Sequence, residues 1–191
     1  MNLGNLLVEL EQVGLQNDAQ QSDRAKKYLN ITRDTGEFLA LLIKATQSNQ
    51  VLEIGTSNGY SSLWLANALP ANGQLFTIEF LSSKADEAQR HFERAGLSHK
   101  ITQLRGDATE LVNELSGAFD FIFLDANRAT YCAMAERLFV LLKPGGLMVC
   151  DNAVSHQQEL AEFVDWVTAQ PHLQTSLVPV GKGELLIYKN Q

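Results

Sequence analysis

The sequence is poor in cysteine, in proline and in long apolar runs, and each shortage excludes a class of protein. Its only cysteines, Cys132 and Cys150, do not make a disulfide framework, so we expect a reducing, cytoplasmic setting. No apolar stretch reaches the roughly 20 residues that cross a bilayer, so no membrane contact is expected. The N-terminus MNLGNLLVELEQ lacks the basic residues of a secretory signal. With four prolines and no Ser/Gly-rich linker, residues 1–191 are expected to form a single domain.

Positive charge is also scarce. Lysine and arginine number 15 against 22 acidic residues, which gives a formal net charge of -7. A surface that binds nucleic acid needs an excess of positive charge, so a broad one is not expected. A small local patch of Arg33, Lys143 and Lys182 remains as an alternative.

Short apolar runs alternate with helical patterns from residue 50 onward. Strands are predicted at 50–55, 74–80, 100–106, 119–125 and 147–151, and helices at 60–69, 83–95, 108–115, 129–142 and 158–169. Such alternation indicates a parallel sheet with helices on both faces. The run Lys143-Pro144-Gly145-Gly146 is expected to end the helix before the fifth strand.

The two ends of the chain depart from this alternation. Residues 173–180 and 184–189 are strand-like and are joined by only three residues, so they predict a hairpin with an antiparallel last strand. The complete sheet would then have seven strands, mostly parallel. Residues 1–49 are expected to form a helical cap. Within it, apolar residues at helical spacing predict a helix that docks on the core or on a second subunit: Leu3, Leu6, Leu7 and Leu10.

The first motif lies between the first strand and its helix and reads EIGTSNGYS, residues 53–61. Gly55 and Gly59 allow a sharp turn close to a ligand, at the sheet edge where α/β proteins bind ligands. The dinucleotide pattern G-x-G-x-x-G is absent, which disfavours a dehydrogenase, and no P-loop lysine follows. Glu53 suits an ammonium group, and the amides of the helix start suit a carboxylate. Together these groups indicate an amino acid, such as the methionine part of S-adenosylmethionine (SAM).

Two further groups point to a nucleoside. Glu79 ends the second strand, 24 residues after Gly55, where an acid can bind ribose hydroxyls. Asp107 and Ala108 follow the third strand and are expected to border the adenine, although Asp107 also fits a helix N-cap.

Asp125 ends the fourth strand, and Asp151-Asn152 end the fifth. Consecutive parallel strands commonly lie side by side, so these three side chains are expected to converge. An all-oxygen set favours a hard cation, Mg²⁺ first, with Ca²⁺ or Mn²⁺ as alternatives. Turn and cap roles explain the same residues equally well from the pattern alone.

At these residues the chain resembles the cation-dependent class I O-methyltransferases, the group of catechol and caffeoyl-CoA O-methyltransferases. The resemblance runs from about Asn30 to Lys189. It covers the entry segment 30–39, the cofactor loop 53–61, the ribose strand 77–79, the adenine loop 105–108, the ligands Asp125, Asp151 and Asn152, and the loop 179–183. It implies a Rossmann-like methyltransferase fold. It also implies cofactor contacts from Ile31, Glu53, Gly55, Thr56, Ser57, Gly59, Tyr60, Ser61, Glu79, Phe80, Asp107, Ala108 and Asp125.

The chain departs from the family pattern in two places. Arg128 stands where the family usually has a lysine, three residues after the first metal ligand, and an arginine is a poor base. Either it supplies a fixed charge to catalysis or it is a surface residue at a helix start. In addition, no acidic residue is apparent before the last hairpin to bind a second catechol hydroxyl, which leaves the acceptor open.

The resemblance therefore implies transfer of a methyl group from SAM to a metal-bound hydroxyl of a small acceptor. Asp125 and Arg128 would be the catalytic residues, and a homodimer is expected. Hydroxyuridine in tRNA is an alternative acceptor. A SAM-binding protein without catalysis is the alternative of another class.

Overall fold

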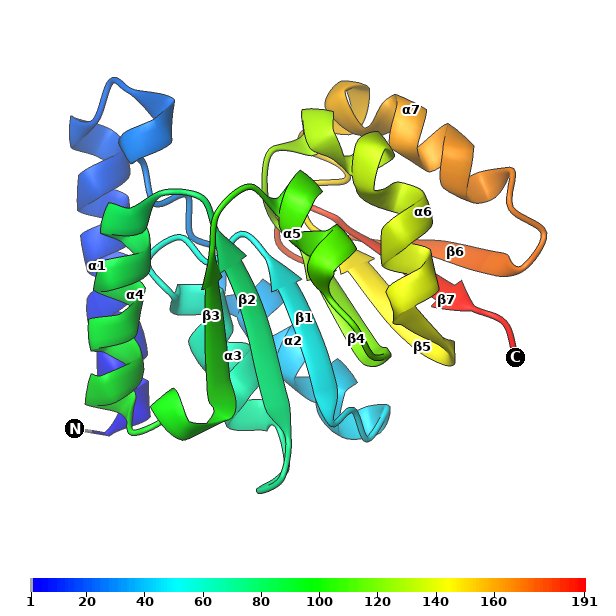
Figure 1. The fold of residues 1–191 in the computed structure, drawn as a ribbon. Coiled ribbons are helices and arrows are strands. Elements are labelled where there is room, and N and C mark those ends of the chain that lie inside the picture. The colour runs from blue at the N-terminus through cyan, green and yellow to red at the C-terminus, as the bar shows by residue number, and fades with distance from the viewer. Residues whose placement is uncertain (1) are drawn as a thin grey trace.

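The computed structural model describes residues 2–191, which fold around one seven-stranded sheet (Figure 1). The strands are β1 (Gln50–Ile54), β2 (Gln74–Glu79), β3 (Ile101–Arg105), β4 (Phe119–Leu124), β5 (Leu142–Cys150), β6 (Leu173–Val178) and β7 (Glu184–Lys189). Their order is β3-β2-β1-β4-β5-β7-β6. Strands β1 to β5 pair in parallel, and β7 runs antiparallel to both β5 and β6. The predicted mixed sheet with an antiparallel last strand is confirmed.

Helices cover both faces of this sheet (Figure 1). One face carries α1 (Leu3–Gln20), α2 (Arg33–Ala45), α3 (Tyr60–Ala68) and α4 (Ser82–Ala95). The other carries α5 (Ala108–Glu114), α6 (Tyr131–Leu141) and α7 (Gln157–Thr168). Three short 3₁₀ turns connect them: η1 (Arg24–Lys26), η2 (Ser98–Lys100) and η3 (Arg128–Thr130). In the described part of the chain, no helix is long and apolar enough to cross a membrane.

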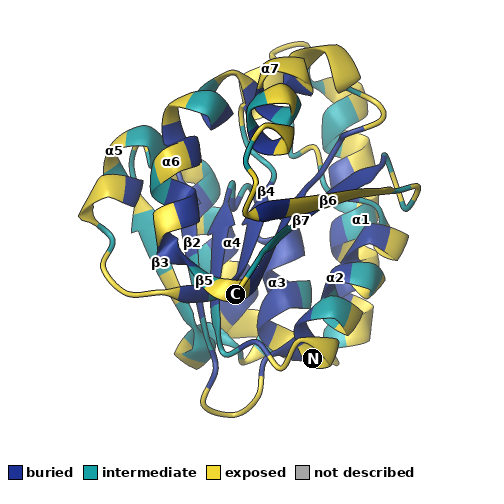
Figure 2. Ribbon diagram, turned by 90° about the vertical axis from the view of Figure 1, so that its right-hand side faces the viewer, coloured by how far each residue is buried: buried dark blue, intermediate teal, exposed yellow. Residues whose placement is uncertain are grey.

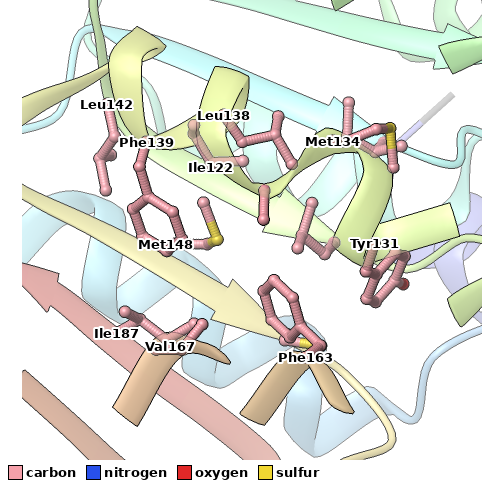
Figure 3. Close-up of a cluster of buried hydrophobic side chains, with 14 of the residues drawn as sticks. Ile122, Tyr131, Met134, Leu138, Phe139, Leu142, Met148, Phe163, Val167 and Ile187 are labelled. Carbon is pink, nitrogen blue, oxygen red and sulfur yellow. The ribbon is translucent and has the colours of Figure 1, made fainter. Parts of the chain in front are cut away.

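The central strands are apolar at nearly every position because they fill two cores at once. Successive side chains of a strand point to opposite faces. In β4, Ile122 packs with the α5–α7 layer, whereas Phe121 and Phe123 pack with the α1–α4 layer. Figure 3 shows the first of these cores, in which side chains of α6 and α7 lie against the sheet residues Ile122 and Met148.

Helix α1 docks on the core, as one of the two predicted alternatives states. Leu6, Leu7 and Leu10 are buried in the same cluster as the first turns of α3. An ion pair of 2.7 Å between Glu9 and Arg94 joins α1 to α4.

The edge strand β6 is exposed along most of its length (Figure 2).

The element boundaries near residue 143 differ from the prediction. The helix ends at Leu141, as the Lys143-Pro144-Gly145-Gly146 run requires, but β5 already begins at Leu142 and includes that run. The pairing of β4 with β5 shifts register between Phe119 and Phe121. Proline and glycine are accommodated in strands at such irregularities.

Main-chain hydrogen bonds continue one residue beyond the carboxyl ends of three strands. The Gly55 amide donates to the carbonyl of Ile78 on β2. The Asp125 amide donates to Ile54 on β1, and the Asp151 amide donates to Leu124 on β4, each at 3.0 Å like the first. The residues that follow β1, β4 and β5 are thereby fixed at one level along this edge of the sheet. The candidate site lies there.

Candidate active site at the carboxyl edge of the sheet

The loop after β1 closes on the end of β2 through Glu79. One carboxylate oxygen of Glu79 accepts the Ser57 amide at 2.8 Å, and the other accepts the Leu81 amide at 2.9 Å. Each oxygen keeps a further lone pair for a ligand hydroxyl. Phe80, next along the chain, is 68% exposed and can cover a flat ring. The predicted contact of Glu79 with a ribose remains a prediction.

Gly55 and Gly59 adopt backbone angles that suit the sharp turn predicted for this loop. Both have positive φ, 105° and 87°. A Cβ on Gly55 would lie 2.2 Å from the carbonyl oxygen of Asp125, and one on Gly59 would lie 2.7 Å from the ring of Phe92. These glycines therefore permit close packing of the loop on β4 and α4. Their predicted approach to a ligand remains a prediction.

Glu53 is fully buried below this loop. Its carboxylate accepts hydrogen bonds from the hydroxyls of Ser61 at 2.5 Å, Thr77 at 2.6 Å and Ser62. Burial raises the pKa of Glu53, while the three hydroxyls oppose that shift. Glu53 and Ser61 therefore tie β1, β2 and α3 together. The predicted contact of Glu53 with a cofactor ammonium group remains a prediction.

Tyr60 belongs to the helix-packing core. Its ring is 1% exposed, and its hydroxyl donates to Glu11 of α1 at 2.6 Å. Ile31 is buried in the same cluster. The predicted contacts of Ile31 and Tyr60 with the cofactor remain predictions. Thr56 is likewise buried, with its hydroxyl 2.6 Å from that of Thr77.

Asp107 caps helix α5, as one of its two readings predicts. Its carboxylate accepts the Thr109 amide at 2.8 Å and the Thr109 hydroxyl at 2.7 Å. Asp107 is exposed beside Ala108 at the end of β3. A contact of these two residues with adenine remains a prediction.

Asp125, Asp151 and Asn152 converge as predicted. The Asn152 amide nitrogen lies 2.8 Å from an oxygen of Asp151 and 3.4 Å from an oxygen of Asp125. Asn152 has φ 68°, a conformation that asparagine tolerates better than most residues. Desolvation, and then the charge of Asp151, raise the pKa of Asp125 well above its usual range. Two carboxylates forced together in this way favour a cation between them.

The donor set fits a hard cation. Among residues 2–191, no three carboxylate, imidazole or thiolate side chains form a metal-binding group, so the amide of Asn152 would be the third ligand. Its nitrogen faces the two carboxylates here. With a cation between them, the amide would turn its oxygen inward, a rotation that keeps the side chain in place.

Glu184, at the start of β7, is a member of this cluster that the sequence analysis missed. It is fully buried, and one of its oxygens accepts the Thr35 hydroxyl at 2.9 Å, while the other has no hydrogen-bond partner among the described residues. Burial, followed by the charge of Asp151, raises the pKa of Glu184 to about 9. Glu184 is therefore a further carboxyl group of this cluster whose charged form is disfavoured.

Arg128 is not a surface residue at a helix start, which corrects one of the two predictions for it. The residue is 7% exposed, and its Nε donates to Glu159 of α7 at 2.7 Å. Burial raises the pKa of both Asp125 and Asp151, and the charge of Arg128 opposes that rise. Arg128 therefore acts electrostatically on two of the residues predicted to bind a cation.

The three basic residues considered for RNA do not form one patch. Arg33 forms an ion pair with Glu11 of α1 at 2.8 Å. Lys143 pairs with Asp120 at 2.6 Å, and Asp120 also accepts the amide of Gln50, the first residue of β1. Lys143 thus lies at the amino edge of the sheet. Lys182 lies towards the opposite edge of the sheet. There its positive charge opposes the rise that burial causes in the pKa of Asp125 and Asp151.

Comparisons with known proteins agree with this geometry. A catechol O-methyltransferase from Niastella koreensis is 38% identical over 138 residues, which cover 70% of this chain and 62% of that protein. Caffeoyl-CoA O-methyltransferase 2 from Petunia hybrida is 31% identical over 179 residues, covering 81% of this chain and 74% of that protein. The crystal structure of the O-methyltransferase TomG from Streptomyces achromogenes in complex with SAM superposes with a TM-score of 0.84 at 28% identity. That superposition covers 97% of this chain and 90% of TomG.

A model of the O-methyltransferase family matches residues 5–190, almost the whole chain. The resemblance inferred from the motifs is confirmed. The chain belongs to the O-methyltransferase family of enzymes.

Proposed function

We propose that the chain transfers the methyl group of SAM to a hydroxyl oxygen of a small aromatic acceptor, in a site that also holds a divalent cation. The observation that carries the proposal is the convergence of Asp125, Asp151 and Asn152. They directly follow β4 and β5, and Ser57, in the loop after β1, donates to Glu79 at the end of the neighbouring strand β2. The catechol and caffeoyl-CoA acceptors of the relatives, and the SAM bound to TomG, support the same assignment.

Different residues of this site would have different roles in the reaction. Glu79 would bind the ribose hydroxyls, and Asp125, Asp151 and Asn152 would hold the cation. When bound, the cation would lower the pKa of the acceptor hydroxyl, and SAM would supply an activated methyl group. The reaction breaks the sulfur–methyl bond and forms an oxygen–methyl bond, while the hydroxyl proton leaves to water. Arg128 cannot accept that proton near neutral pH, so it would contribute positive charge and position.

The test is methyl transfer from labelled SAM to catechol, with Mg²⁺ or with excess EDTA. We expect EDTA to abolish transfer and to leave the binding of S-adenosylhomocysteine (SAH) largely intact. Asp151→Ala should behave like the wild-type protein in EDTA. Asp165→Ala, the same change at an exposed position of α7, should retain full activity. Undiminished transfer in EDTA, or in Asp151→Ala, would contradict the cation site.

A further inference from the structure

We infer that the acceptor carries a carboxylate and that Arg128 recognises it, an inference that rests on the proposed function. Arg128 is then a specificity-determining residue. The argument follows from its burial, its single partner and the hollow beside that partner.

The guanidinium of Arg128 is incompletely paired. Its side chain is 6% exposed, and within residues 2–191 its only hydrogen bond runs from Nε to Glu159. The two terminal nitrogens carry four N–H groups and have no hydrogen-bond partner among the described residues, and neither nitrogen is fully buried. Donors that are mostly withdrawn from water and lack partners are costly, and more so when they are charged. A ligand with two acceptor oxygens would satisfy both terminal nitrogens at once.

The partner of Arg128 lines an open hollow of about 320 Å³ formed by residues 154–159. Val154, the first of these lining residues, comes two positions after Asn152 in the sequence, and Glu159 is the last. Its volume suits a single substituted ring. A hydroxyl at the cation ligands and a substituent near Arg128 would then belong to one acceptor that lies along this hollow.

The charges around the hollow favour an anionic substituent. Among its lining residues, Glu159 is acidic, and its side chain is 51% exposed, so water competes for it. His156 is the one lining residue that could be cationic, and burial and the charge of Arg128 lower its pKa. Arg24 and Lys182 also contribute to that shift, and the effect of Arg128 is larger than that of either. The planar fork of Arg128 matches a carboxylate through two parallel hydrogen bonds, whereas a lysine would offer a single point charge.

The experiment compares 3,4-dihydroxybenzoate with its neutral analogue 3,4-dihydroxybenzamide. Calorimetry measures the binding of each to the protein saturated with SAH and Mg²⁺, and the transfer assay measures kcat and KM. We expect the wild-type protein to bind the acid about tenfold more tightly than the amide. Arg128→Gln should remove that preference and raise KM for the acid about tenfold, and it should change binding of the amide little. Arg128→Lys should retain part of the preference.

The control is Arg90→Gln, which removes an exposed arginine from α4, a helix on the opposite face of the sheet, and should keep the wild-type preference. An equal acid-to-amide ratio in the wild-type and Arg128→Gln proteins, or no binding of the acid, would overturn the inference. Transfer to neutral catechol in that case would leave the proposed function intact. Conversely, an Arg128-dependent preference in binding without any methyl transfer would support the inference and contradict the proposed function.

Discussion

Gly55 and Gly117 show how one backbone angle can serve different purposes. Both have φ 105°, which disfavours any residue with a Cβ. A Cβ on Gly55 would collide with the backbone of Asp125, whereas nothing lies within 4 Å of a Cβ on Gly117. Substitutions at these two glycines can therefore separate two contributions to stability. One is the strain of a positive φ, and the other is the steric clash of a side chain with the backbone of Asp125.

We predict that Gly55→Ala lowers the free energy of unfolding by about 2–5 kcal/mol, the sum of strain and overpacking. Gly117→Ala should cost about 1–2 kcal/mol, from strain alone. Urea denaturation monitored by circular dichroism measures both. Equal losses in the two variants would show that contact with Asp125 is not what requires glycine at position 55.

The residues that the sequence predicted well are those that follow strands. Asp125, Asp151 and Asn152 come directly after apolar runs, and a parallel sheet brings the ends of such runs together. Glu184 could not be found in this way, because its partner Thr35 is 149 residues away and because it begins a strand that could equally face solvent. The motif also does not show that the Tyr60 hydroxyl donates to Glu11 of α1.

At the scale of elements, the spacing of apolar residues predicted the succession of strands and helices along the chain. The three-residue connection at 181–183 predicted the hairpin. What the pattern could not give was the length of β5, because its Pro-Gly-Gly segment signals a break while the register shift against β4 accommodates it. It also did not reveal that the segment around Tyr28 lies across the cofactor loop. The Ser57 hydroxyl donates to the carbonyl of Tyr28 at 2.8 Å.

Tyr28 joins this segment to α4, because its hydroxyl donates to Glu87 at 2.6 Å. Burial, and then this hydrogen bond, raise the pKa of Tyr28 from 10.0 to about 12. A pKa raised on folding means that the stabilisation is fully present below pH 10 and is lost as the pH rises towards 12.

We therefore predict that the wild-type protein loses more stability than Tyr28→Phe between pH 10 and pH 12. Denaturant titrations across this range measure the difference, and the ultraviolet absorbance of the phenolate reports the pKa. Glu87→Gln should lower the pKa of Tyr28, because it removes the acceptor charge. Parallel pH profiles for the wild-type protein and Tyr28→Phe would rule out a stabilising role for this hydrogen bond.

At the scale of the molecule, strand order determines where the two ligands meet. The sheet runs outward from β1 in one direction through β2 and in the other through β4 and β5 (Figure 1). The carboxyl edge therefore opens at β1 and β4, and ligands of α/β sheets bind at such a reversal. The residues proposed for the nucleoside lie at or just beyond the ends of β1 and β2, and those proposed for the cation directly follow β4 and β5. The acceptor hydroxyl would lie between the methyl donor and the cation.

The most direct test of this account is diffraction from crystals grown with SAH and Mn²⁺, using the anomalous signal of manganese to locate the cation. The account predicts one strong peak at ligand distance from side-chain oxygens of Asp125, Asp151 and Asn152. It also predicts the ribose of SAH on Glu79. A peak elsewhere, or SAH bound with no manganese at these three residues, would contradict the proposal of a cation-dependent methyl transfer at this edge of the sheet.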